Sequence, residues 1–251
     1  MTSGKHTVRA VPGKSEEHRK NPACALDLTP AEAKYFWSWF IFGSLMTVET
    51  RHHLWRSWGF CPRHSWAHAA VECEIWGGRP FGTAILYEDL VGRAAAATKS
   101  LMLPGGLNRR RLRSRGTCLV CDYVAVSRNF EDEVYVDRSA RVNRRLRISA
   151  LLREAEPQWR PSSCPLCLNG HGIVCRAHIL SGAAKPDREL SERLAELSRR
   201  LALYVRSMTW QGPKVNAETK ASWVEALGWF AGWDFPVAVV AATGPRLARS
   251  E

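Results

Sequence analysis

Apolar positions along this chain recur with helical spacing. In the segment 186–205 the large aliphatic residues are three or four positions apart, which gives the stripe of an amphipathic helix: Leu190, Leu194, Leu197, Leu201 and Val205. That stripe is a candidate surface for packing against the core or for forming an oligomer through the Leu190 to Val205 helix. The alternating stretch 237–240 is too short to predict a strand. The pattern therefore predicts an all-α protein.

Turn and cap signals predict further helices. Thr29, Pro30 and Glu32 carry the signature of a helix start, ahead of a very aromatic segment that runs to about Leu54. Because aromatic side chains dominate core burial, we interpret this segment as a central packing helix rather than a platform for a ligand. The other helices are expected over 65–76, 80–97, 123–156 and 219–233.

Cysteine and histidine residues stand at the spacing of metal ligands. Cys164 and Cys167 form a C-x-x-C turn, and Cys175 and His178 form a Cys-x-x-His pair shortly after it. Zn²⁺ prefers thiolate sulfur and imidazole nitrogen, and two such pairs supply the four ligands of a tetrahedral site. This stretch predicts a metal site, with zinc as the first candidate.

A second Cys-x-x-His pair, Cys61 and His64, also follows a glycine and bulky apolar residues. Cysteines stand upstream of both pairs: Cys24 precedes the first, and Cys118 with Cys121 precedes the second. Each half of the chain would then contain upstream cysteines, a helical stretch and a Cys-x-x-His pair, in that order. These echoes predict an internal repeat of two helical modules with one or two zinc ions.

The ligand set of each module stays open. In the first module Cys24, Cys61 and His64 are the candidates, and Asn21 stands where the repeat would place a fourth. Three protein ligands would leave one coordination position for water or substrate, as in a catalytic zinc site.

In the second module Cys175 and His178 can be completed by either of two cysteine pairs. The repeat favours the pair at 118 and 121, whereas the short knuckle spacing favours the pair at 164 and 167.

These motifs resemble an uncharacterised bacterial family whose members carry C-P-x-C, a helical stretch, G-F-C-x-x-H, an apolar Y-x-D-L segment and a second, looser copy. The resemblance spans roughly residues 21–235, departs at Asn21 and at the Cys164 to Cys167 pair, and implies a metal-binding fold without a known reaction. The matching residues are Pro22, Cys24, Gly59, Phe60, Cys61, His64, Tyr87, Asp89, Leu90, Cys118, Cys121, Cys175 and His178.

The expected organisation follows from these motifs and from the turn signal Pro104-Gly105-Gly106. It comprises a disordered tail over 1–20, the first Cys/His module over 21–105, a basic linker over 106–117, the second module with the C-terminal helices over 118–240, and a frayed tail over 241–251. A chain of 251 residues, 45% of them hydrophobic, is long enough for a real core.

Composition narrows the setting of the protein. The chain has no apolar run long enough to span a membrane and no secretory signal at its start, so a cytoplasmic protein without a membrane partner is expected. In that compartment thiols stay reduced, which favours ligands over disulfides.

The formal net charge is +12, carried mostly by arginine. Arginine forks bind phosphate oxygens, so a nucleic acid or an acidic protein is the expected partner, with solvated helix faces as the alternative explanation of the charge. The candidate nucleic-acid-binding residues are Arg109, Arg110, Arg111, Arg113 and Arg115, and a second series comprises Arg138, Arg141, Arg144, Arg145 and Arg147.

Other chemistry has little support. The chain has no Walker loop, dinucleotide fingerprint, nucleophile elbow or H-E-x-x-H motif. Glu88 and Asp89 are neighbours on a helix and point in different directions, so they do not form an acid–base pair. Cys73 is interpreted as a small buried hydrophobic residue. His52 or His53 is a weaker candidate to reach a metal held by the first module.

Three functional hypotheses follow. The first is a zinc-stabilised helical binding protein that engages nucleic acid or another anionic partner. The second is a zinc enzyme with an open site at Cys24, Cys61 and His64. The third is a thiol redox protein, or a protein that holds iron or an iron–sulfur cluster.

Overall fold

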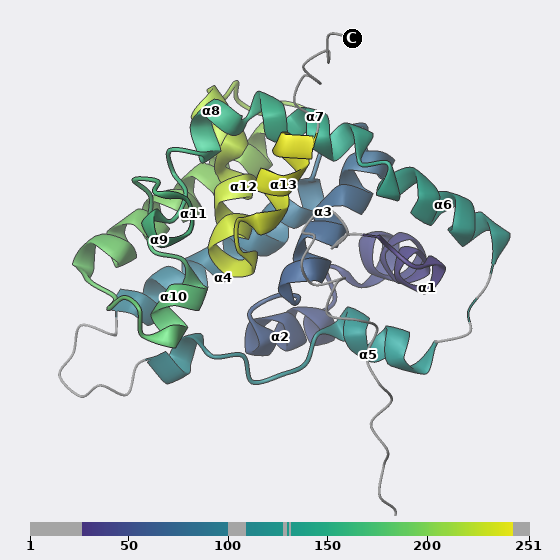
Figure 1. Cartoon of the computed structure of the whole chain (residues 1–251), viewed down its shortest axis with the longest axis horizontal. Helices are drawn as coiled ribbons and strands as arrows, with labels where there is room; N and C mark the ends of the chain where they lie inside the picture. Colours follow the sequence, from purple (N-terminus) through teal and green to yellow (C-terminus); the bar gives the residue numbers. More distant parts are fainter. Residues whose placement is uncertain (1–26, 100–108, 128–129, 131, 243–251) are drawn as a thin grey trace, which may run out of the picture.

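The computed structural model describes residues 27–99, 109–127, 130 and 132–242, and every regular element in these ranges is a helix (Figure 1). The predicted all-α class is therefore confirmed. The helices are α1 (Pro30–Lys34), η3 (Tyr35–Ser44), α2 (Val48–Ser57), α3 (Pro62–Ile75), α4 (Phe81–Lys99), η5 (Arg109–Leu112), α5 (Leu119–Val126), α6 (Glu133–Asn143), α7 (Leu146–Glu154), α8 (Glu156–Trp159), α9 (Pro165–Leu168), α10 (Arg176–Ser181), α11 (Arg188–Ser207), α12 (Ala217–Ala231) and α13 (Asp234–Ala242).

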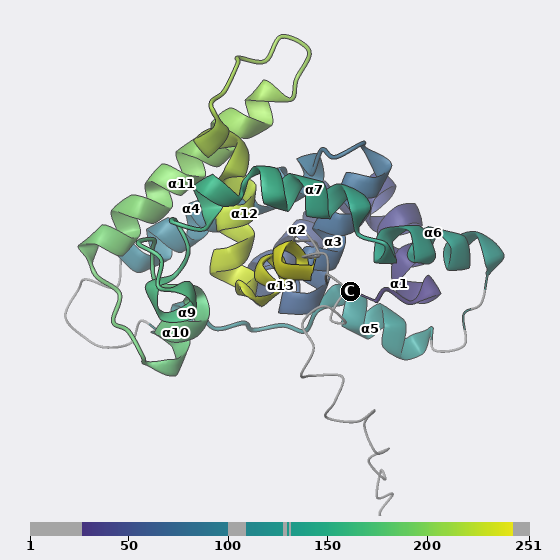
Figure 2. The same cartoon turned by 45° about the horizontal axis from the view of Figure 1, so that its top comes forward.

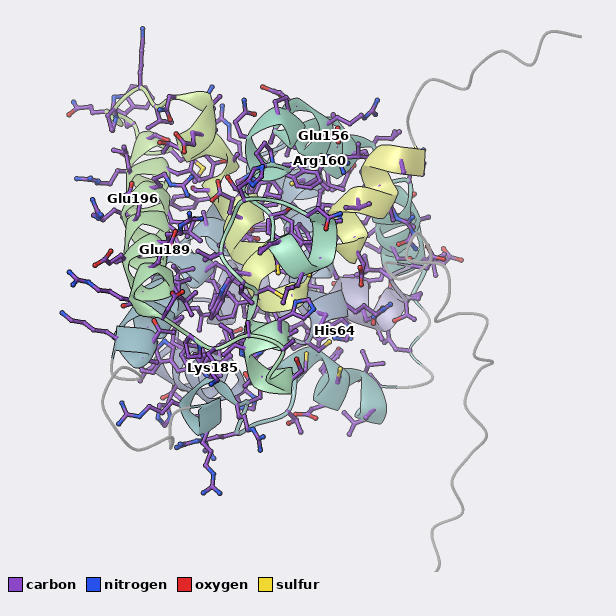
Figure 3. The ribbon with its side chains drawn as sticks, turned by 60° about the vertical axis from the view of Figure 1, so that its left-hand side comes forward. His64, Glu156, Arg160, Lys185, Glu189 and Glu196 are labelled. Atoms are coloured by element: carbon purple, nitrogen blue, oxygen red, sulfur yellow. The ribbon has the colours of Figure 1, made fainter. Side chains whose placement is uncertain are left out.

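The leucine stripe predicted over 186–205 lies on α11 and faces the core. Leu190, Leu194, Leu197 and Leu201 are buried, and α11 lies along α4 with α12 packed against both helices (Figure 2). The opposite face of α11 carries charged side chains, as Figure 3 shows for Glu189 and Glu196. The stripe thus packs within the chain, which is one of the two roles expected for it.

The aromatic segment after Thr29 forms two helices that meet end to end, followed by a turn and α2. The predicted capping box at Thr29 is present at the start of α1, but the single helix expected as far as Leu54 is wrong. From Tyr35 the chain winds as the π-helix η3, which ends at Ser44. One face of η3 is buried in the core, whereas Phe42 on the other face is 58% exposed.

The long helix expected over 123–156 is also broken. Asp132 caps α6 by accepting a hydrogen bond from the backbone N–H of Val134 at 3.0 Å. Arg145 has a left-handed backbone, with φ 56°, and separates α6 from α7. The stretch 237–240 belongs to α13. No glycine or proline marks the breaks within 123–156, so polar side chains and tertiary packing determine where α6 and α7 begin.

The predicted repeat is not confirmed as a structural repeat. Both Cys-x-x-His pairs begin a helix, but α3 has 14 residues and α10 has 6. The tail at 1–20 and the turn Pro104–Gly106 lie outside the described residues, as does the end of the chain from 243. None of the described helices is long and apolar enough to cross a bilayer.

Candidate metal centres

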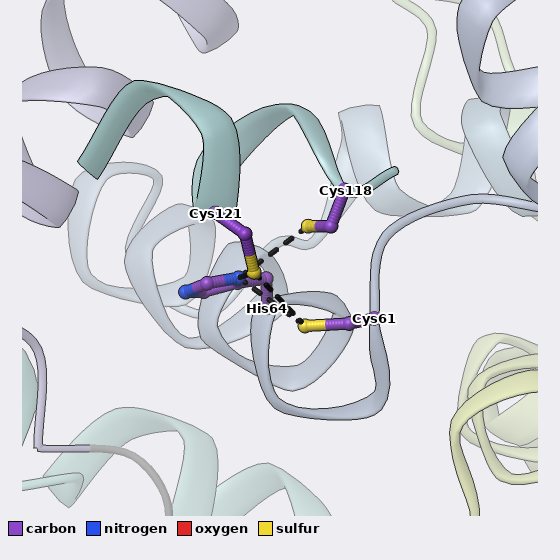
Figure 4. Close-up of side chains that lie close together, drawn as sticks. All are labelled: Cys61, His64, Cys118 and Cys121. Carbon is purple, nitrogen blue, oxygen red and sulfur yellow. Dashed lines mark hydrogen bonds between the residues drawn. The ribbon is translucent and has the colours of Figure 1, made fainter. Parts of the chain in front are cut away.

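Four side chains from two distant segments meet in a first cluster, formed by Cys61, His64, Cys118 and Cys121 (Figure 4). Nδ1 of His64 lies 3.2 Å from the sulfur of Cys61 and 3.4 Å from each of the other two sulfurs. The sulfurs of Cys61 and Cys121 are 3.9 Å apart. The cluster therefore has three sulfurs and one nitrogen around a common centre.

Helix starts position these four ligands. Cys61 is the N-cap of α3 and Cys118 is the N-cap of α5, so that His64 and Cys121 follow in the first turns. The chain reverses before Cys61 through left-handed residues, including Gly59 at φ 90°. Backbone N–H groups and the positive end of a helix dipole favour thiolates, which makes helix starts suitable places for metal-binding cysteines.

Buried polar groups orient the imidazole of His64. Its Nε2 donates a hydrogen bond to Oε1 of Glu32 at 2.8 Å, which leaves Nδ1 to face the sulfurs. Burial opposes ionisation of Glu32, but its hydrogen bonds with His64 and Arg63 outweigh burial and lower the pKa of this carboxyl to about 2. A carboxylate behind a ligating histidine fixes the tautomer and strengthens the ligand.

Removing this charge should weaken metal binding by the first cluster. Glu32→Gln keeps the shape and the capping oxygen of the side chain but loses the carboxylate that orients His64. We expect the metal affinity of the first cluster to fall about 10- to 100-fold. Competition with a chelator would measure it, and the second cluster in the same molecule is the internal control, because Glu32 does not contact it. Equal loss from both clusters would contradict this role.

The second cluster is local in sequence. Cys164, Cys167, Cys175 and His178 place their ligand atoms within 4.8 Å of one another. The sulfurs of Cys167 and Cys175 are 3.7 Å apart, and Nδ1 of His178 lies 3.2 Å from the sulfur of Cys175 and 3.5 Å from that of Cys164. Three thiols and one imidazole again surround one centre.

A tight backbone loop brings these residues together. The N–H of Gly172 donates to the carbonyl of Ser163 at 3.0 Å, and that of His171 donates to the carbonyl of Pro161 at 2.8 Å. A Cβ on Gly172 would lie 1.8 Å from the carbonyl oxygen of Ser162, so no other residue fits here without a shift. We call residues 161–178 the knuckle.

The spacing of the donor atoms fits a zinc ion. Zinc–sulfur bonds of about 2.3 Å and zinc–nitrogen bonds of about 2.0 to 2.1 Å in a tetrahedron put sulfurs about 3.8 Å apart and sulfur about 3.6 Å from nitrogen. The distances in both clusters, between 3.2 and 3.9 Å, lie around these values. The described cysteines are free thiols, so every sulfur is available as a ligand.

The hydrogen bonds within the first cluster favour a thiolate before any metal is considered. The Cys61 thiol and the ring of His64 lower the pKa of Cys118, against the opposing effect of burial. The same contact with Cys118 raises the pKa of Cys61. The thiolate is the form of cysteine that binds metal, so the contacts around Cys118 favour its metal-binding form.

Among the described residues, the candidate ligands form two groups. Of the two pairs considered for Cys175 and His178, the one at 164 and 167 joins them. The other pair, at 118 and 121, instead joins Cys61 and His64, so the grouping of this pair with Cys175 and His178, which the repeat favours, is wrong. Cys24 lies outside the described residues.

Other candidate residues have structural partners. Nε2 of His53 lies 2.9 Å from the carbonyl oxygen of Thr117, the residue before a cluster cysteine, and His53 is not a member of either cluster. Asp89 pairs with Arg51 and Arg93, each at 3.3 Å. Cys73 is fully buried, as expected for a small core residue.

The two arginine series differ in their environment. In the second series four side chains have partners within the chain: Arg138 stacks on Trp37 and Tyr135, while Arg141, Arg145 and Arg147 pair with Asp137, Asp27 and Glu74. In the first series Arg110, Arg111, Arg113 and Arg115 are exposed, and only the backbone of Arg109 is described.

Comparison with known proteins adds no assignment: no family model, no curated protein and no solved structure matches this chain. The resemblance to the bacterial family with paired C-P-x-C and G-F-C-x-x-H motifs therefore stays a prediction. Any functional conclusion has to come from the residues themselves.

Proposed function

We propose that this protein is a helical binding protein stabilised by two zinc ions, and that its basic surface engages nucleic acid or another anionic partner. The observation that carries the proposal is that each cluster brings together four protein ligands. Structural zinc sites use four protein ligands, whereas catalytic sites keep one position for water or substrate. Zinc here would act by holding helices together.

The position of the clusters supports a structural role. The first cluster joins the start of α3 to the start of α5, and its residues His64 and Cys118 are 54 positions apart in the chain. The second cluster closes the knuckle, a segment without long helices of its own. In both places metal–ligand bonds would supply cohesion that apolar burial alone does not provide.

The alternative of an open catalytic site at Cys24, Cys61 and His64 is less well supported. Cys118 and Cys121 complete a set of four around Cys61 and His64 without Cys24. The thiol or iron hypothesis draws on the same cysteines, and the mixed sulfur and nitrogen ligands suit zinc more directly than an all-thiolate iron–sulfur cluster.

Metal analysis of protein purified without added metal tests the proposal. We expect two equivalents of zinc per chain and no visible absorption bands. Cys24→Ser should keep both equivalents, because both ligand sets are complete without this residue. Visible bands with bound iron would favour the redox hypothesis instead, and loss of one zinc from Cys24→Ser would restore the open-site enzyme.

A further inference from the structure

The segment from η5 to the start of α5 is an extended stretch of irregular backbone that runs from beside α10 to α5 (Figure 1). At one end η5 packs against α10, the helix capped by Cys175. At the other end the segment leads into Cys118, a member of the first cluster. The stretch expected as a basic linker therefore connects the two candidate metal centres directly.

Hydrogen bonds hold the backbone of this segment against the end of α2. The N–H of Arg115 donates to the carbonyl of Arg56 at 2.7 Å, and the hydroxyl of Ser114 donates to the carbonyl of Ser57 at 2.8 Å. Nε1 of Trp58 donates to the carbonyl of Arg111 at 3.0 Å. The segment is fixed along its inner side.

The knuckle supplies a second anchor. Arg176, next to Cys175, donates from Nε to the carbonyl of Leu112 at 2.8 Å and from a terminal nitrogen to Oγ of Ser114 at 2.9 Å. Leu112 itself is fully buried. Both clusters thus fix the course of the segment, one through Arg176 and the other through Cys118.

The anchored backbone presents arginines to solvent. Arg56, Arg110, Arg113 and Arg115, which we call the arginine ridge, are exposed, and within the described part of the chain none of the four has an acidic partner. Most of the second series, by contrast, is engaged within the chain. Four unneutralised guanidinium groups on a fixed backbone form a preorganised anion-binding surface.

We infer that the arginine ridge binds the phosphate backbone of nucleic acid, an inference that rests on the proposed function and names its partner. Protein interfaces have an apolar centre, whereas between Arg110 and Thr117 the one large apolar side chain, Leu112, is buried. The surface offers charge and hydrogen bonds only, which is what a phosphate backbone needs. Because backbone contacts carry no base readout, binding depends weakly on sequence.

A salt titration of DNA binding tests the inference. A labelled random-sequence duplex is titrated with the metal-loaded full chain between about 50 and 200 mM salt. Four phosphate contacts predict that log affinity falls with log salt with a slope of about −3.6. Replacing Arg110, Arg113 and Arg115 by alanine should reduce the magnitude of the slope by about 2.7, and Arg56→Ala alone should reduce it by about 0.9.

A charge-matched variant distinguishes the effect of the arginine ridge on DNA binding from the effect of the net charge of the protein. Arg160, Arg188 and Arg199 are exposed arginines outside both candidate series, each in an ion pair, and replacing all three by alanine removes the same formal charge. This variant should keep the wild-type slope. Equal slopes for the ridge variant and the control variant would overturn the inference.

Two further results would also overturn it. One is the absence of binding to duplex DNA, single-stranded DNA and RNA at about 50 mM salt and micromolar protein, where non-specific binders associate. The other is binding of polyglutamate that competes with and exceeds DNA binding. In either case two zinc equivalents measured in the same preparation would leave the zinc scaffold standing, so the two failures are distinguishable.

Discussion

Cys118→Ser is expected to remove one of two zinc equivalents and to destabilise the protein severely. Cys118 belongs to a cluster that fastens α5 to the start of α3, and closing the long loop between them removes much conformational freedom from the unfolded chain. Structural zinc contributes about 10 to 16 kcal/mol of apparent binding free energy in small zinc domains, which is comparable with the whole stability of a typical domain, about 5 to 15 kcal/mol.

Metal content and thermal unfolding, measured on the same samples, check this prediction. Cys73→Ala is the matched control, since Cys73 is buried but belongs to neither cluster, and it should keep both metals at a cost of about 1 kcal/mol. Cys175→Ser should release the other equivalent, with a smaller effect on distant helices because its cluster is local. A Cys118→Ser protein with two zinc ions and the wild-type melting temperature would refute the structural role of the first cluster.

Local signals in the sequence predict local structure well. The capping box at Thr29 and the leucine stripe of α11 depend on neighbours within one or two turns, and both are present in the structure. The second cluster is predictable for the same reason: Cys164 and His178 are only 14 positions apart, so the chain between them has few ways to arrange its ligands.

The spacing of cysteines along the chain does not determine which distant residues share a metal site. The grouping of Cys118 and Cys121 with Cys61 and His64 depends on how the helices of the first half pack against α5. The repeat pattern predicts that each Cys-x-x-His pairs with upstream cysteines, because that order is the simplest repeat. The sequence marks Glu32, the side chain that orients His64, only as part of a capping box, and nothing in its local sequence indicates the second role.

The predicted helix boundaries are wrong where no glycine or proline marks the end of a helix. The expected helix over 123–156 contains neither glycine nor proline, yet it ends after Val126 and resumes under the Asp132 cap. The left-handed turn at Arg145 has no sequence signature, since an arginine rarely takes this conformation without tertiary support. After the break, α6 packs against α1, the helix that carries Glu32, the hydrogen-bond partner of His64.

Gly172→Ala is expected to open the second cluster without touching a ligand. The added Cβ would lie 1.8 Å from the carbonyl oxygen and 2.3 Å from the carbonyl carbon of Ser162, and backbone atoms cannot yield as a flexible side chain can. The two arms of the knuckle must then separate, which moves Cys164 away from Cys175. Overpacking of this kind costs about 1 to 3 kcal/mol before any loss of metal is counted.

Zinc release to a chelator measures the effect of Gly172→Ala. We expect one equivalent to leave faster than in the wild type, while the first cluster, which does not involve the knuckle, keeps its metal. Gly43→Ala is the matched control, because a Cβ at Gly43 meets no atom within 4 Å. Wild-type release of both equivalents from Gly172→Ala would mean that the close approach of Gly172 to Ser162 does not hold the second cluster together. If the zinc of the second cluster is released slowly from Gly43→Ala and rapidly from Gly172→Ala, the backbone contact between Gly172 and Ser162 shapes this metal site.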